Sequence, residues 1–406
     1  MYGSKTARRL RARIGRFSGD VSAGLGVVAQ RFVAEMIYGI QASGSVLLTE
    51  VARTLQESIA VRKTHMRLSR NLQRPELEGV VQDNVLRLAA PQVGRDTLLV
   101  IDPSDVAKKY AKKMEYLATV RDGSAHELSA GYWTLHVMGA ELGTERVVPL
   151  YQRLYSSNAP GFVSENDEVL RAVDAVRAHV GDRGLWVMDR GGDRIHLFEP
   201  LLDRKARFLF RLVGNRDVVV RGETLLASEA VARVRRRFTQ TIVKIVDGRE
   251  ETYTLRFGAQ AVRLPGREGP LYLVVIDGFG PEPLMLLTTE DPGRSFKRLW
   301  RLVRAYLRRW AIEETIRYVK PAMTSRTCVC SSIRDCATCC PCCLPSCSSP
   351  PVYWTMIVAC VSWPNTSSRP PNASSAYRTS SITPWPMACA PCLPGTRALP
   401  CPASEP

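Results

Sequence analysis

The residues best suited to chemistry are carboxylates placed at the ends of two apolar runs and on one helix. Leu98–Ile101 is a short apolar run that leads into Asp102, and Gly184–Met188 leads into Asp189 in the same way. Runs of this length predict buried strands. A third carboxylate, Glu313, lies in a segment with helical spacing. Magnesium prefers hard oxygen ligands, so these three side chains could hold two ions over a phosphodiester. A single aspartate at a strand end, however, often caps the following turn.

The segment around Glu313 predicts a helix with one functional face. Tyr306, Arg309, Glu313 and Lys320 stand at offsets of 0, 3, 7 and 14 residues. At about 100° per residue, these four side chains fall within an arc of about 60°. One interpretation is a solvated stripe of salt bridges, in which Arg309 supports Glu313 four residues on. The other is a catalytic face that combines a metal-binding carboxylate with phosphate-binding cations.

The spacing of these four residues resembles the Tyr/Arg/Glu/Lys signature of the DDE transposases in the family named after insertion sequence four. The segments Val100–Asp105 and Trp186–Gly191 are similar to the first and second Asp motifs of that family. The resemblance covers about Thr97 to Lys320. It implies an α/β fold with a ribonuclease-H-like catalytic core and a β-rich insertion between the second Asp and the Glu.

Carried over by position, the resemblance implies that Asp102, Asp189 and Glu313 are the catalytic residues and the ligands of two Mg²⁺ ions, which Mn²⁺ can replace. It further implies that Tyr306, Arg309 and Lys320 hold DNA phosphates near the cleaved end. The neighbouring acids Asp105, Asp193 and Glu314 fall outside the matched positions.

Three more arginines are candidates for DNA contact. Arg190 directly follows the second Asp, while Arg211 and Arg216 follow the apolar run Phe208–Phe210. Guanidinium groups suit phosphate by charge and by donor geometry. For Arg211 and Arg216 the alternative is an ordinary strand end followed by a turn.

The order of predicted elements supports an α/β core. Tyr132–Met138 and Arg146–Leu150 follow the first apolar run as strand candidates, which predicts an antiparallel meander. Glu165–His179 then has helical spacing. Further strand-like stretches follow at 218–220, 240–246, 252–257 and 271–276, separated by Gly, Pro and charged turns. The chain returns to a basic helix at 295–319.

Five regions follow from these patterns. We predict a helical basic DNA-binding region at 1–95, the first part of the core at 96–212, a β-rich insertion at 213–290, a catalytic helix completing the core at 291–321, and an irregular tail at 322–406.

The charge of the chain indicates a polyanionic partner. The formal net charge is +17, and residues 1–95 alone carry fifteen Lys/Arg against seven Asp/Glu. Such an excess favours nucleic acid, although a solvated basic surface has the same composition. Within this region, the apolar spacing of Ser45–Leu55 and the basic stretch Arg62–Arg70 allow either a helix-turn-helix or an ordinary helical hairpin. No run of eighteen uncharged apolar residues occurs, so we expect a soluble protein of the bacterial cytoplasm and nucleoid, with no membrane partner.

The composition changes abruptly after Lys320. All twelve cysteines, fifteen of the twenty-six prolines and only two acids fall in the last eighty-six residues. A zinc module or a disulfide-stapled module would also concentrate cysteine, but the spacings here repeat no ligand pairs. Runs such as Cys339–Cys343 are what leucine codons yield when read out of frame. We therefore expect a frame error near Ala322 and a disordered tail.

These observations leave three hypotheses. The resemblance implies a transposase of a bacterial insertion sequence, which cuts element ends and joins the 3′-hydroxyl to target DNA, with a homodimer in the synaptic complex. The second hypothesis is an inactive frameshifted remnant that binds element-end DNA without cleaving it. A metal-dependent nuclease of the same fold is the third.

Overall fold

The computed structural model describes residues 2–309, apart from 109–110, 112–113, 122–126, 145 and 247–248. Of the predicted site residues, Glu313 and Lys320 lie outside the described residues, as does the predicted tail at 322–406. The predicted helix at 295–319 is described only as far as Arg309.

The amino-terminal region consists of helices packed around one apolar cluster. These helices are α1 (Tyr2–Val21), α2 (Val27–Ser43), α3 (Leu48–Thr54), α4 (Val61–Leu72) and α5 (Glu76–Ala89), followed by a 3₁₀ turn at Ala90–Gln92. α2 fills the centre because Phe32 and Met36 are fully buried. It ends at Gly44, whose φ of 63° belongs to the left-handed region that glycine adopts without strain.

In the described part of the chain, no single helix is long and apolar enough to cross a membrane. α2 and α3, which are bent by 91° relative to each other, meet the length and composition requirement only as a pair.

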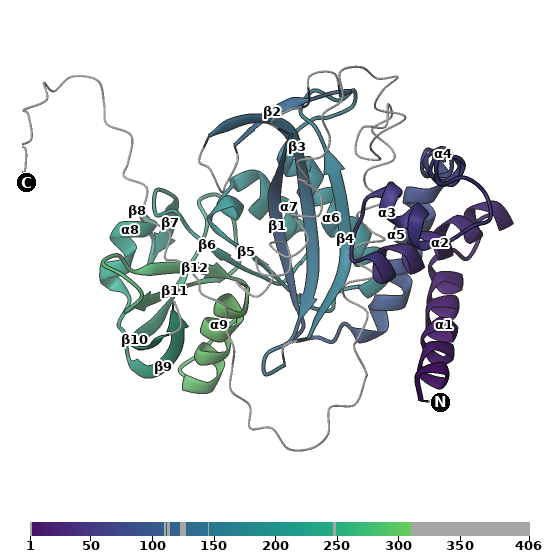
Figure 1. Ribbon diagram of the computed structural model, residues 1–406. Coiled ribbons are helices and arrows are strands. Elements are labelled where there is room, and N and C mark those ends of the chain that lie inside the picture. The colour runs from purple at the N-terminus through teal and green to yellow at the C-terminus, as the bar shows by residue number, and fades with distance from the viewer. Residues whose placement is uncertain are drawn as a thin grey trace, which may run out of the picture.

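A large mixed sheet forms the centre of the molecule (Figure 1). Its first half contains β1 (Leu98–Ala107), β2 (Ala118–Arg121), β3 (Leu128–Ala140), β4 (Val147–Tyr155), β5 (Leu185–Met188) and β6 (Phe208–Arg211). β1 pairs antiparallel with β3, and β3 pairs antiparallel with β4, which confirms the predicted meander. On its other side β1 pairs parallel with β5, and β5 pairs parallel with β6.

β1 does not end at Asp102, as the apolar run had suggested. It continues through Pro103 to Ala107 and stays paired with β3 throughout. The pairing with β5 stops at Val100. A proline is tolerated here because one side of the strand has lost its hydrogen-bonding neighbour.

The predicted insertion extends the same sheet. β9 (Phe238–Val246), β10 (Arg249–Val262), β11 (Leu271–Asp277) and β12 (Leu284–Thr288) form antiparallel neighbours, and β12 pairs with β6. β7 (Asp217–Val220) and β8 (Glu223–Leu226) form a separate hairpin beside the short helix α8 (Ala227–Ala230) and a 3₁₀ turn at Val231–Arg233. The residues between the second Asp and α9 are therefore β-rich, and β9–β12 are joined edge to edge with the central strands.

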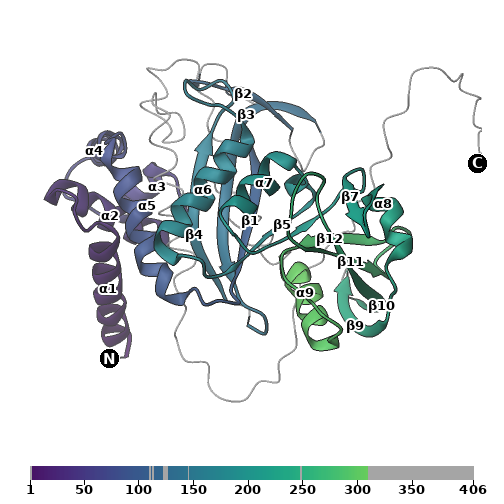
Figure 2. The same ribbon diagram turned by 180° about the vertical axis from the view of Figure 1, so that it is seen from behind.

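Helices cover both faces of the sheet. α6 (Glu165–Val180) and α7 (Ile195–Asp203) pack on the face that carries Leu99 and Ile101 (Figure 2). α9 (Phe296–Arg308) belongs to the apolar cluster on the opposite face, with Val100 and Val187. The side chains of a strand alternate between the two faces of the sheet. Even-numbered residues of β1 therefore face α9, and odd-numbered residues face α6 and α7.

An ion-pair network fixes the start of α9 against the sheet. Arg301 of α9 contacts Glu290 at 2.8 Å and Asp96, just before β1, at 2.5 Å. Arg207, just before β6, binds both carboxylate oxygens of Glu290 at 2.7 and 2.8 Å. These bonds hold the pKa of Glu290 below its usual range. The network therefore ties α9 to two adjacent parts of the sheet.

Candidate functional site

Asp102 and Asp189 occupy the same level of two neighbouring strands. The last register partners of the β1–β5 pair are Val100 and Val187. Asp102 lies two residues further along β1, and Asp189 lies two residues further along the chain, directly after β5. Two residues return a side chain to the same face, so both carboxylates lie on the face of Val100 and Val187. This is the face on which α9 packs. Both aspartates are only partly buried.

The same level of the sheet carries further polar residues. His136 of β3 is the register partner of Asp102, and Gln152 of β4 is the register partner of His136. On the other side, Phe210 pairs with Met188, which places Arg211 beside Asp189. We call Gln152, His136, Asp102, Asp189 and Arg211 the polar row. It runs across β4, β3, β1, the end of β5 and β6 on one face of the sheet.

The backbone after β5 orients the Asp189 carboxylate. Asp189 has extended dihedral angles and caps a short 3₁₀ turn at Arg190–Gly192, and its Oδ1 accepts a hydrogen bond from the Gly191 amide at 2.8 Å. A Cβ atom at Gly191 would lie 3.0 Å from that same oxygen, which is closer than ordinary packing allows. A side chain at this position would therefore push against the Asp189 carboxylate. In the described residues, Oδ2 has no hydrogen-bond partner and is available to a ligand.

His136 is the buried member of the row beside Asp102. Its side chain is 1% exposed, and burial lowers its pKa to about 3, so the imidazole is neutral at physiological pH. Its Nε2 lies 3.1 Å from the Thr134 hydroxyl, which in turn donates to the Ser104 carbonyl at 3.2 Å. The ring is thus held by Thr134 of the same strand, whose hydroxyl links β3 to β1. Neither His136 nor Gln152 was a candidate from sequence, although Thr134 and His136 are the polar residues at alternate positions of that strand.

Two of the predicted phosphate-binding residues, Tyr306 of α9 and Arg309 directly after it, lie inside the protein. Tyr306 is fully buried and Arg309 is 5% exposed, with the Arg309 guanidinium 5.6 Å from the centre of the Tyr306 ring. Among the described residues, the Tyr306 hydroxyl has no hydrogen-bond partner. The Tyr306 ring belongs to the same apolar cluster as Leu302 and Val303. Glu313 and Lys320, the other members of the signature, lie outside the described residues.

The three further arginines have different environments. Arg190 is exposed and Arg211 is half-buried, and the structure shows no partner for either side chain among the described residues. Arg216 is different because its guanidinium pairs with the Asp193 carboxylate and lies 4.9 Å from the centre of the Phe198 ring. The Asp193 side chain is 1% exposed and also accepts a hydrogen bond from the Val213 amide at 2.7 Å. Arg216 and Asp193 thus form a buried structural pair.

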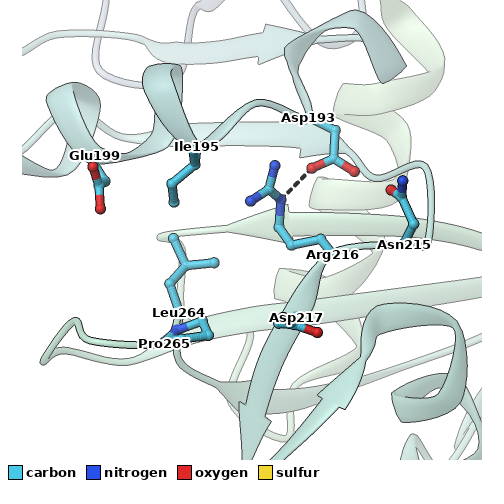
Figure 3. Close-up of a pocket in the computed structure, with 8 residues that line it drawn as sticks. All are labelled: Asp193, Ile195, Glu199, Asn215, Arg216, Asp217, Leu264 and Pro265. Carbon is cyan, nitrogen blue, oxygen red and sulfur yellow. Dashed lines mark hydrogen bonds and ion pairs between the residues drawn. The ribbon is translucent and has the colours of Figure 1, made fainter.

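This pair closes one side of a cavity of about 450 Å³ between α7 and the β6–β7 connection (Figure 3). The cavity is lined by Asp193, Ile195, Glu199, Asn215, Arg216, Asp217, Leu264 and Pro265. Neither Asp102 nor Asp189 lines it. Figure 3 shows the Arg216 side chain directed toward Asp193, which leaves the cavity without a free cation among its described lining residues.

The Asp102 and Asp189 carboxylates are suitable ligands for a hard divalent cation, but they are only two of the three side chains predicted to bind it. Asp102 and Asp189 offer oxygen ligands from adjacent strands, as Mg²⁺ and Mn²⁺ require. Within the described ranges, no group of three or more His, Cys, Asp or Glu side chains gathers at a metal-binding distance. The pair therefore provides two of the three predicted ligands, and the third, Glu313, lies beyond the last described residue.

By sequence, no protein family and no curated protein matches the chain. Among solved structures, it is similar to the piggyBac transposase in a cryo-EM structure of its synaptic complex with hairpin DNA, at 13% sequence identity and a TM-score of 0.39. The match covers 72% of this chain, and this chain spans 59% of the transposase chain. The functional assignment therefore rests on the residues of the chain itself.

Proposed function

We propose that this chain is a DNA transposase whose metal-binding site is formed by Asp102, Asp189 and Glu313. The observation that carries the proposal is the placement of Asp102 and Asp189 at one level and on one face of adjacent parallel strands. Sequence motifs that resemble the DDE transposases of the family named after insertion sequence four point to the same two residues. The strand order supports a ribonuclease-H-like core, because β4, β3, β1, β5 and β6 are consecutive neighbours with only β3 antiparallel to the others.

The proposed reaction consists of two in-line displacements at phosphorus. Water attacks the phosphodiester at an element end and releases a 3′-hydroxyl, and that hydroxyl then attacks a phosphodiester of target DNA. When bound, two Mg²⁺ ions would activate the attacking oxygen and stabilise the leaving oxygen. Asp102 and Asp189 would hold these ions, and the Gly191 amide would keep the Asp189 carboxylate oriented. Arg190 and Arg211, which have no described partner, would contact the phosphates.

The basic amino-terminal helices supply the proposed affinity for DNA. Residues 1–95 have a net charge of +8, and phosphate contacts made by such a surface release counterions. Binding should therefore weaken steeply as salt increases. The proposed DNA substrates are element ends and target duplex, and synapsis of two ends would require two copies of the chain.

Cleavage assays with the frame-restored chain test this proposal. The wild-type protein should nick and join a duplex carrying the element end in Mg²⁺ or Mn²⁺, whereas Asp102→Asn, Asp189→Asn and Glu313→Gln should lose both steps and retain DNA binding. Asp105→Asn is the matched control, because Asp105 lies three residues further along β1 and therefore points to the opposite face. Full cleavage by any of the three variants would remove that residue from the site.

A second function is favoured by the composition of the tail. A chain that continues into an out-of-frame segment could bind element-end DNA without cutting it, because the residues that should follow Ala322 and pack against the Glu313 helix would be replaced. The chain as written would then bind duplex in a salt-dependent manner and show no cleavage, while the frame-restored chain would do both. Cleavage by both chains would instead show that the tail does not prevent catalysis.

A further inference from the structure

α4 has one buried face and one exposed face. Its buried residues pack with α2 and α3 and include Thr64, His65, Leu68 and Leu72. The exposed residues on the other side are Arg62, Lys63, Met66 and Arg70, which we call the α4 stripe. At about 100° per residue, these four side chains lie within an arc of about 100°. α4 contains no acidic residue, so the stripe is uniformly basic around a single methionine.

The remaining cation of α4 has a different task. Arg67 uses both terminal nitrogens inside the protein, where Nη1 contacts Glu35 of α2 at 2.5 Å and Nη2 contacts Glu57 at 2.9 Å. In contrast, the structure shows no partner among the described residues for the side chains of Arg62, Lys63 and Arg70. The helix thus uses one arginine for its own packing and leaves three cations available for an external anion.

Glu57 locks α4 in a fixed orientation. Its carboxylate accepts hydrogen bonds from the Thr64 hydroxyl at 2.7 Å and from Arg67, and it also binds Arg31 of α2 at 3.1 Å. These bonds connect the α3–α4 loop to both α2 and α4. The α4 stripe is therefore presented by a rigid support, which reduces the entropy lost when a partner binds.

We propose that the α4 stripe enters the major groove of duplex DNA and reads base edges there. This inference rests on the proposed function, because it assigns sequence recognition of the element end to one helix. Eight residues separate Arg62 from Arg70, which corresponds to about 12 Å along a helix. The major groove is about 12 Å wide and admits a helix. Arg and Lys bind guanine O6 and N7, and Met66 offers an apolar contact to a thymine methyl group.

Two comparisons favour this surface and this partner. α1 also exposes Arg9, Arg11, Arg13 and Arg16, but Arg11 lies about 140–160° from Arg9 and Arg16, so the charge of α1 is spread around the helix, as suits contacts to phosphates. An acidic membrane surface would also attract cations. Stable insertion of an interfacial helix requires a broad apolar face, and α4 exposes only Val61 and Met66 as apolar side chains.

The test uses the full chain in EDTA, which prevents cleavage and makes the result independent of the catalytic proposal. The wild-type chain is used to select duplexes from a random-sequence library, and its affinity for a selected duplex is compared with that for a scrambled one at several salt concentrations. Three variants are measured beside it. The first is Arg62→Ala/Lys63→Ala/Arg70→Ala, the second is Met66→Ala, and the matched control is Arg9→Ala/Arg11→Ala/Arg16→Ala, which removes the same charge from α1.

We expect the α4 triple variant to lose the preference for the selected duplex, with a ratio of affinities near 1. The α1 triple variant should bind both duplexes more weakly and keep the ratio, because phosphate contacts carry no sequence information. Met66→Ala should lower the ratio several-fold without changing the salt dependence. Circular dichroism and thermal melting should be unchanged, since all these side chains are exposed.

Three results would overturn the proposal. One is the absence of any enriched sequence with the wild-type chain, and another is an α4 triple variant that keeps the wild-type ratio. The third is binding to vesicles containing acidic phospholipid that equals DNA binding and is lost in the same variant, which would assign the stripe to a membrane surface. A chain that selects a sequence through α4 but never cleaves DNA would leave this inference standing and contradict only the catalytic proposal.

Discussion

Asp102 of β1 and Asp189, which directly follows the adjacent parallel strand β5, each lie two residues beyond the register partners Val100 and Val187 and therefore at one level and on the same face of the sheet. Neighbouring strands are about 4.8 Å apart, so two carboxylates at this level repel each other unless a cation or a proton compensates them. The arrangement is maintained by the β1–β5 register and by the hydrogen bond from the Gly191 amide to Asp189. A divalent cation between the two side chains would relieve this repulsion.

The first prediction concerns stabilisation by metal. Mn²⁺ should raise the melting temperature of the wild-type chain, because a ligand that binds only the folded state at about 100 times its Kd adds about 2.7 kcal/mol to the free energy of unfolding. Asp102→Asn and Asp189→Asn should remove this increase, and the metal-free variants should be at least as stable as the wild type, because the repulsion between the two carboxylates is relieved. Differential scanning fluorimetry with and without Mn²⁺ measures both effects. An equal Mn²⁺ response in either variant would contradict its role as a ligand.

The second prediction concerns His136. Its neutral ring stands beside Asp102 and is held by the Thr134 hydroxyl, so we expect it to fix the position of the Asp102 side chain. His136→Phe keeps a planar ring, somewhat larger than imidazole, and removes the polar atoms. Loss of such a supporting group typically weakens metal binding about 10–100-fold. Titration with Mn²⁺ measures this change.

The matched control is His65→Phe, because His65 is also buried but lies on α4, far along the chain from the aspartates. It should leave Mn²⁺ affinity unchanged even if it lowers the melting temperature. Equal Mn²⁺ affinity in His136→Phe and the wild type would limit His136 to a packing role.

The strands that carry the aspartates could be predicted because each is a continuous apolar run. Leu98–Ile101 and Leu185–Met188 are buried on both faces, and such strands stand out in a sequence. The polar row could not be predicted, because it depends on the register between strands that are far apart in the chain. His136 is recognised as the neighbour of Asp102 only when the register of β3 against β1 is known, since a shift of one residue would place its side chain on the other face.

The arginines that follow β5 and β6 illustrate the same limit. Arg211 and Arg216 are similar in sequence context, yet only Arg216 meets a buried acid, because the turn after Asp189 brings Asp193 to it. Likewise, the β-rich composition of 213–290 was apparent from its turns, but its pairing with β6 through β12 depends on contacts that local spacing does not specify. The periodicity of the sequence therefore predicts the strands, whereas contacts between distant segments determine how the strands pair and which arginine meets an acid.

The third prediction concerns the anchor of α9. Glu290→Gln removes the charge that binds both Arg207 and Arg301, and we expect a loss of about 1–3 kcal/mol in the free energy of unfolding. The bonds from Arg207 and Arg301 lower the pKa of Glu290, so this stability is present above the unfolded pKa and is lost as the pH falls through the folded pKa. Urea unfolding of both proteins at neutral and acidic pH should show a difference that shrinks in acid.

Glu223→Gln is the control for this variant, because Glu223 forms an exposed ion pair with Arg233 on the β7–β8 hairpin. Exposed pairs contribute little, so its unfolding midpoint should match the wild type. A Glu290→Gln protein that is as stable as the wild type at neutral pH would show that the network does not hold α9 in place.

The fourth prediction concerns Glu78 of α5, whose carboxyl group interacts electrostatically with Arg153 of β4 and Glu168 of α6. Burial raises the pKa of Glu78 to about 7, and the nearby Glu168 carboxylate adds to this rise, while Arg153 opposes it. Between pH 4.5 and about 7, the Glu78 carboxyl is therefore protonated in the folded state and ionised in the unfolded state. The contribution to stability is fully present below pH 4.5 and is lost as the pH rises through about 7.

Glu78→Gln should therefore be more stable than the wild type at pH 8, by about 1–3 kcal/mol, and should differ little from it near pH 5. Glu76→Gln, on the exposed side of the same helix, should follow the wild type at both values. Urea unfolding at pH 5, 6, 7 and 8 measures these differences. The amino-terminal helices meet the sheet through α5, so a stabilisation confined to high pH would locate a titrating group at this junction. Parallel curves for Glu78→Gln and the wild type would show that the Glu78 carboxyl is ionised and solvated in the folded protein.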